Sequence, residues 1–195
     1  MVFGSAGQLS MLFIGLIVEG IYDEAALTEL VRKYVPPDVR VICRPCGNAI
    51  QLMKKFPGFL QEFRHAKDGA PVDKALIIRD ADHKSPAELL AKMEARIVNR
   101  VYPFPRKLLV AVEELEAWLL ADEEALSSVT GKAVRQIANP EKINDPKAIL
   151  QRILSDAGIA YTAEVARKIA AAIRSDILAA RCPSFKKFQD AIANN

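Results

Sequence analysis

The sequence predicts an α/β fold of Rossmann-like type: an open, mostly parallel four-stranded sheet with helices on both faces, followed by a C-terminal helical extension. Two observations predict it. Four short apolar runs alternate with segments of helical periodicity, and this order implies parallel strands joined by right-handed crossovers. The first run, residues 12–18, is apolar on both faces, as is typical of a strand covered on both sides of a parallel sheet.

Turn and capping residues set the boundaries of these elements. Pro36 and Pro37 end the first helix. Pro57 and Gly58 are expected to interrupt or kink the second helix, and Ser85 is expected to cap the third. The expected strands span residues 12–18, 39–43, 73–79 and 107–112, and the helices between them span about 22–34, 48–65 and 85–97.

The chain beyond residue 122 shows helical patterns only. Asp145, Thr162 and Ser184 are expected helix caps, because each precedes apolar residues at helical spacing. We therefore expect three parts along the chain. They are a flexible N-terminal segment at residues 1–10, an α/β domain at 11–122 and a helical extension at 123–195 that packs on this domain.

The composition is that of a globular protein rather than of a membrane or secreted one. Hydrophobic residues make up 51% of the chain, which is enough for a core, yet no apolar run approaches the ~18 residues of a membrane helix. Cys43, Cys46 and Cys182 are odd in number and form no disulfide framework, so a cytoplasmic location is expected. The net charge of +3 is too small to indicate a nucleic-acid partner by itself.

Acidic side chains follow the expected strands at their carboxyl ends, where open α/β sheets bind ligands. Glu19 follows the first strand, and Asp80 and Asp82 follow the third. Residues i and i+2 of a strand point to the same side, so Asp80 and Asp82 are expected to leave the backbone in one direction. Carboxylates so close repel each other unless a cation neutralises them. The sequence therefore predicts a Mg²⁺ or Mn²⁺ site at this edge of the sheet.

These motifs resemble the Toprim domain, the metal-binding α/β module of type IA and type II topoisomerases, bacterial primases and OLD-family nucleases. That domain has a strand ending in Glu-Gly and a later strand ending in Asp-x-Asp, and OLD-type members place a further acid where Asp23 stands here. From Met11 onward the chain is also similar to a family of small, uncharacterised bacterial Toprim-like proteins, DUF4276. The motifs that carry the similarity are Val18-Glu19-Gly20, Asp80-Ala81-Asp82, the run from Glu114 to Asp122, Asp145-Pro146-Lys147 and Pro183-Ser184-Phe185.

The resemblance implies Mg²⁺-dependent phosphodiester chemistry on nucleic acid, by a nuclease or nicking enzyme of phage defence or mobile elements. Glu19 would be the general acid/base or a ligand, and Asp80 and Asp82 would be ligands. Asp23 is a further candidate ligand and Glu116 a candidate additional acid. The alternative is a non-catalytic, metal- or nucleotide-binding module that works through a protein partner such as an ATPase. No membrane partner is expected, and a homodimer is compatible with the sequence.

Other residues have both a functional and an ordinary interpretation. Arg44 and Arg79 are candidates for binding a phosphate, and so is His83, although each also suits a solvated surface. Cys43 and Cys46 have the spacing of a zinc pair, but no second pair completes a site, so no zinc is expected. An Asp-x-Asp can also cap a turn. A hydrolase of small phosphates or a receiver domain is a third alternative, although in the former the Asp-x-Asp follows the first strand rather than the third.

Overall fold

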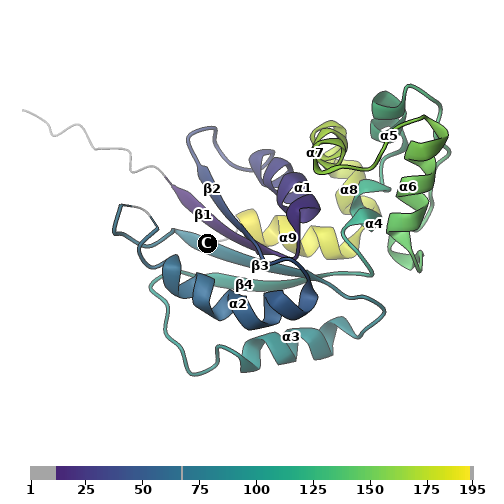
Figure 1. Ribbon diagram of the computed structural model, residues 1–195. Helices are drawn as coiled ribbons and strands as arrows, with labels where there is room; N and C mark the ends of the chain where they lie inside the picture. The colour runs from purple at the N-terminus through teal and green to yellow at the C-terminus, as the bar shows by residue number, and fades with distance from the viewer. Residues whose placement is uncertain (1–11, 67, 194–195) are drawn as a thin grey trace, which may run out of the picture.

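The computed structural model describes residues 12–66 and 68–193 and contains one parallel sheet (Figure 1). The strand order is β2-β1-β3-β4, and every pair of neighbours is parallel. The predicted α/β class is therefore confirmed, and the N-terminal segment expected to be flexible lies outside the described residues. The strands are β1 (Phe13–Val18), β2 (Arg40–Pro45), β3 (Lys74–Asp80) and β4 (Arg106–Ala111).

Side chains that alternate along the strands feed two separate hydrophobic cores. Ile14, Leu16 and Val18 belong to a core that also holds residues of α1 (Ile21–Arg32) and α9 (Pro183–Ala193). Phe13 and Ile17 point to the other face. The second core is completed by α2 (Ala49–Glu62) and α3 (Pro86–Ala95), so helices cover both faces of the sheet (Figure 1). Adjacent residues of one strand thus face different helices.

The C-terminal helices share the first of these cores with the sheet. Trp118 packs edge-on against Phe185 at a ring distance of 5.2 Å and lies beside Phe188. Helix α7 lies along α1, as Figure 1 shows at the top of the molecule. These elements are α4 (Glu116–Leu119), α5 (Glu123–Thr130), α6 (Pro146–Asp156), α7 (Ala163–Ala172) and α8 (Ser175–Arg181), with a 3-10 turn at Pro140–Lys142.

Three predicted caps are confirmed and one is wrong. The side chains of Ser85, Asp145 and Thr162 each accept a hydrogen bond from a backbone N–H three residues on. Ser184 lies inside α9, which begins at Pro183. Its hydroxyl instead accepts a hydrogen bond of 2.8 Å from the indole N–H of Trp118. The buried indole needs a hydrogen-bond acceptor, and Ser184 provides it. The local sequence pattern predicted a helix cap at Ser184 because it contains no information on this tertiary contact.

The second helix was predicted to be interrupted or kinked, and the interruption is wrong. Helix α2 runs from Ala49 to Glu62 without a break at Pro57 and Gly58. Proline removes one helical hydrogen bond, but Pro57 is buried next to Phe56, and burial of its apolar ring opposes that loss. None of the helices in the described part of the chain combines the length and apolar character that crossing a bilayer requires.

Candidate functional site

The carboxyl ends of β1 and β3 bring Glu19 and Asp80 into contact. The two strands are neighbours, with Ile17 paired to Ile77, so the next residues of each strand lie at one edge of the sheet. The Oε1 atom of Glu19 accepts a hydrogen bond of 3.0 Å from the backbone N–H of Asp80. The predicted meeting of these two acids, 61 residues apart in sequence, is therefore confirmed.

The side chain of Asp80 points to the α1 face and enters a group of acids. Its Oδ1 atom accepts a hydrogen bond of 3.0 Å from the N–H of Leu115. Burial raises the pKa of Asp80 well above its usual range, and the negative charges of Asp23 and Glu19 raise it further. Such an environment disfavours the ionised carboxylate unless a positive charge or a proton is supplied.

Asp23 lies on the first turn of α1 and faces the same group. Its Oδ2 atom accepts a hydrogen bond of 2.7 Å from the N–H of Gly20, which closes the turn between β1 and α1. Burial raises the pKa of Asp23 to about 7, and the charges of Glu116 and Glu19 add to the effect. Asp23 therefore changes its charge near neutral pH.

Glu116 reaches this group from α4 and is held by two residues of the helical extension. Its side chain is only 4% exposed. The hydroxyl of Tyr161 donates a hydrogen bond of 3.1 Å to Glu116 Oε1, and the Nζ atom of Lys147 lies 3.4 Å from the same oxygen. Burial by itself would lower the pKa of Lys147, but the carboxylates of Glu116, Glu114 and Asp23 together raise it. Lys147 thus provides a fixed positive charge beside the acids.

Asp82 lies beyond the end of β3. The prediction that strand alternation places Asp80 and Asp82 on the same side is therefore wrong. The strand ends at Asp80, and Asp82 has a left-handed backbone with φ of 47°. The N–H of Asp82 donates to the carbonyl of Glu113, which joins the loops after β3 and β4. Its charge still acts on Glu19, whose pKa burial raises first and Asp82 raises further.

Backbone strain is concentrated at this edge of the sheet. Asp82, His83 and Glu113 have positive φ angles of 47°, 62° and 59°, a region that side chains other than glycine seldom adopt. His83 and Glu113 also contact each other, with 2.7 Å between Nδ1 and Oε2. Strained residues persist only where the surrounding structure holds them, and they are frequent at functional sites.

Arg79 lies on the opposite face of the sheet from Asp80 and next to Glu19. Its side chain is 6% exposed, and its Nε atom is 3.9 Å from Glu19 Oε1. The same Nε donates a hydrogen bond to the carbonyl of Asp80. Glu19 therefore stands between two environments, with the acids of the α1 face on one side and a buried guanidinium on the other. We call Glu19, Asp23, Asp80, Asp82 and Glu116 the acidic cluster.

The structure does not bring the other candidates into the acidic cluster. Arg44 pairs with Glu62 at 3.3 Å and lies over the ring of Phe63. The imidazole of His83 is 67% exposed and turned to Glu113. The three cysteines are free thiols, and burial raises the pKa of Cys46 to about 11 and that of Cys43 still higher. These thiols are protonated at neutral pH.

The donor chemistry of the acidic cluster fits a hard divalent cation. Its members offer carboxylate oxygens only, and the hydrogen bonds found for Glu19, Asp23 and Asp80 each occupy one oxygen of the pair. Within residues 12–66 and 68–193, however, no three His, Cys, Asp or Glu side chains are already arranged as ligands of one ion. Ion binding would thus need side-chain rotation, and the predicted metal site stays a prediction.

Two residues of this site, Lys147 and Tyr161, carry no functional signal in the sequence pattern. Lys147 belongs to a motif that carried the family resemblance, but only its neighbour Asp145 had an assigned role. Tyr161 has no local signal, because it reaches Glu116 from 45 residues away. The ring of Tyr161 also stacks on Tyr22 at 5.0 Å, and this contact holds α1 and the extension together around the acids.

Fold and site together define a class: a parallel α/β protein with a buried acidic cluster at the carboxyl edge of its sheet. Within that class, the chain belongs to the family described as a domain of unknown function, DUF4276, whose model matches residues 18–193. That match includes all five members of the acidic cluster. No curated protein and no solved structure matches the chain.

Proposed function

We propose that this protein is a Toprim-like, Mg²⁺-dependent enzyme that cleaves or nicks phosphodiester bonds of nucleic acid. The observation that carries the proposal is the acidic cluster. Asp80, Asp23 and Glu19 have raised pKa values because they are buried next to one another. A fold gains nothing from burying like charges, so such a cluster indicates a site for a cation.

Glu19, Asp80 and Asp82 would hold the ion, with Asp23 as a further ligand. When bound, a divalent ion supplies charge that stabilises the attacking and leaving oxygens of a phosphoryl displacement. Asp80 is positioned for this role by the N–H of Leu115, which donates a hydrogen bond to one of its two oxygens. Glu116 is already paired with the charge of Lys147 and accepts a hydrogen bond from Tyr161, so we assign it a supporting role.

Glu19 and Arg79 supply the groups that act on the phosphate. The raised pKa of Glu19 brings its proton exchange closer to neutral pH, which is what a general acid or base requires. Arg79 lies beside it and carries a charge that can bind phosphate oxygens. An arginine held against the general acid/base would keep the scissile group within reach of both.

The test uses the full chain on supercoiled plasmid and on labelled single- and double-stranded DNA and RNA, with Mg²⁺, Mn²⁺ or EDTA. We expect cleavage that depends on the metal. In Asp80→Asn, which keeps an oxygen for the Leu115 N–H, the loss should exceed the about 10–100-fold typical of outer-shell partners of a metal. Asp38→Asn, in an exposed turn, is the matched control. Equal activity of Asp80→Asn and wild type, or no cleavage under any condition, would refute the proposal.

The second candidate is a non-catalytic metal- or nucleotide-binding module that acts through a partner such as an ATPase. One observation favours it: the net charge of the chain is only +3, which is small for a protein whose substrate is nucleic acid. Titration calorimetry with Mg²⁺ and Mn²⁺ separates the two candidates. Heat of binding that is lost in Asp80→Asn, together with no turnover of any nucleic acid, would favour the module.

A further inference from the structure

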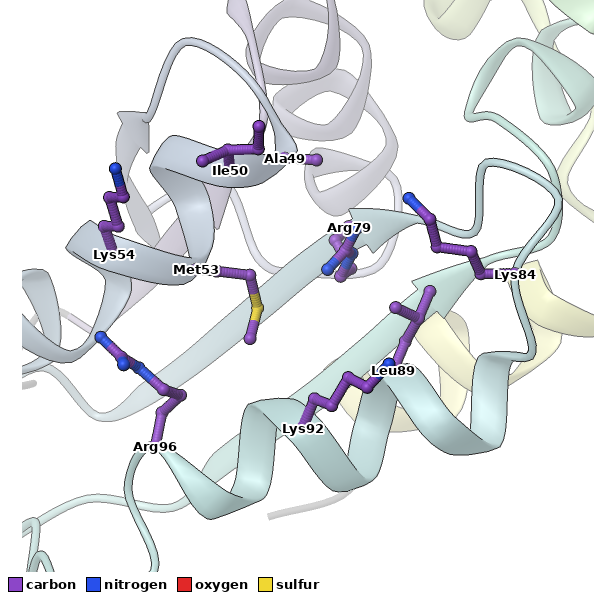
Figure 2. Close-up of a pocket in the computed structure, with 9 residues that line it drawn as sticks. All are labelled: Ala49, Ile50, Met53, Lys54, Arg79, Lys84, Leu89, Lys92 and Arg96. Atoms are coloured by element: carbon purple, nitrogen blue, oxygen red, sulfur yellow. The ribbon is translucent and has the colours of Figure 1, made fainter.

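A groove runs between α2 and α3 on the face of the sheet opposite to Asp80. Figure 2 shows Arg79 rising from β3 between the two helices, with Met53 of α2 pointing into the same space. The cavity has a volume of about 410 Å³, within the range of small-ligand sites. We call it the basic groove, and its lining residues are Ala49, Ile50, Met53, Lys54, Arg79, Lys84, Leu89, Lys92 and Arg96.

The charge of the basic groove is of one sign. Five of its nine lining residues are cationic and none is acidic. The four apart from Arg79 are exposed, and none of them takes part in an ion pair within the described part of the chain. Elsewhere on this molecule arginines and lysines are commonly paired, as Arg174 is with Asp122 and Arg181 with Glu123. These groove cations are Lys54, Lys84, Lys92 and Arg96.

Two further features favour an anionic ligand here. The first turn of α2 lines the groove at Ala49 and Ile50, and the N-terminus of a helix carries a partial positive charge. Arg79 lines the groove and also lies 3.9 Å from Glu19, so the groove reaches one member of the acidic cluster. A phosphate bound by Arg79 would therefore be next to the proposed general acid/base.

We infer that the basic groove binds a single strand of nucleic acid and delivers its backbone to the acidic cluster. The inference deepens the proposed function and rests on it for the chemistry, but the binding itself needs no metal. The groove cations extend from Lys84, before α3, to Arg96 at its end, and the ten residues of α3 alone span about 15 Å. This length suits several consecutive phosphates rather than one nucleotide.

The apolar part of the lining favours unpaired bases over a duplex. Ile50 is 68% exposed, and it lies with the partly exposed Met53 among the cations. In a duplex the base faces are stacked on one another and cannot contact such side chains, whereas in a single strand they can. Among the described residues, none that lines the groove is aromatic, so we expect little base stacking and a weak sequence preference.

The experiment measures fluorescence anisotropy of a labelled 12-nucleotide single strand in EDTA, with the full chain. Lys92→Glu combined with Arg96→Glu reverses two groove cations. Arg135→Glu combined with Lys187→Glu makes the same change in charge on exposed residues away from the groove. Two lost phosphate contacts should lower the slope of log Kd against log salt by about 1.4, which is about 25-fold in affinity at 0.1 M salt. Circular dichroism confirms that each variant is folded.

Weaker binding in the groove variant, with the control close to wild type, supports the inference. Equal affinities of the three proteins would overturn it. It would also be overturned if a duplex of the same length, or a nucleoside triphosphate, competed better than the unlabelled strand. Because the binding assay contains EDTA, its result is independent of the cleavage assay. Metal-dependent cleavage together with equal affinities of the three proteins would reject only the groove. Groove-dependent binding without any cleavage would reject only the catalytic proposal.

Discussion

Replacing Asp23 by asparagine should stabilise the protein at pH 8 and change it little at pH 4. Asparagine keeps a carbonyl oxygen that can accept the N–H of Gly20, which lies 2.7 Å from Asp23 Oδ2. The substitution therefore removes the charge and leaves the turn between β1 and α1 intact. It also removes a negative charge that raises the pKa of Asp80.

The direction follows from proton binding. The pKa of Asp23 is about 7 in the folded protein against 3.8 in an unfolded chain, so between these values the folded state holds a proton that the unfolded state has lost. Stability from this group is thus present at pH 4, falls as pH rises toward 7 and stays low above it. A rise of about three pKa units corresponds to at most about 4 kcal/mol.

We expect about half of that limit, roughly 2 kcal/mol, because protonation of Asp80 or Glu19 relieves part of the repulsion in the wild type. For a chain of 195 residues this is roughly 4–8 °C in Tm. Thermal unfolding of wild type, Asp23→Asn and the exposed control Asp38→Asn at pH 4, 6 and 8 in EDTA measures it. A difference between Asp23→Asn and wild type that does not grow with pH would refute the reasoning.

Two further predictions concern the core. A Cβ atom at Gly15 would lie 2.4 Å from the ring of Phe63, so Gly15→Ala should lower the free energy of unfolding in urea by about 1–3 kcal/mol. Gly58→Ala, with open space around the new Cβ atom, should raise that free energy by about 0.5–1 kcal/mol. Equal stabilities of the two variants would contradict the packing. Ser184→Ala removes the acceptor of the buried Trp118 N–H and should cost about 1–3 kcal/mol with a changed tryptophan emission, and an unchanged emission would speak against this contact.

The class of the fold follows from the order of apolar and helical segments along the chain. Apolar runs separated by helix-length segments predict a parallel sheet, because consecutive parallel strands must be joined by long crossovers whereas antiparallel strands can be joined by short turns. The sequence also predicted that Glu19 and Asp80 meet, because the carboxyl ends of neighbouring parallel strands share an edge. Three of its four named caps were correct, because a cap is a bond between residues three apart.

The arrangement of the acids depends on contacts between elements that are distant in the sequence. Asp82 leaves the strand through a left-handed residue, and the loop after β4 fixes that turn, so the alternation of β3 could not place it. Glu116 depends on Tyr161 and Lys147, and the basic groove arises where α2 and α3 lie side by side over Arg79. Local patterns specify which residues belong to a strand or helix. Contacts across tens of residues determine which charges become neighbours, because they depend on how whole elements pack.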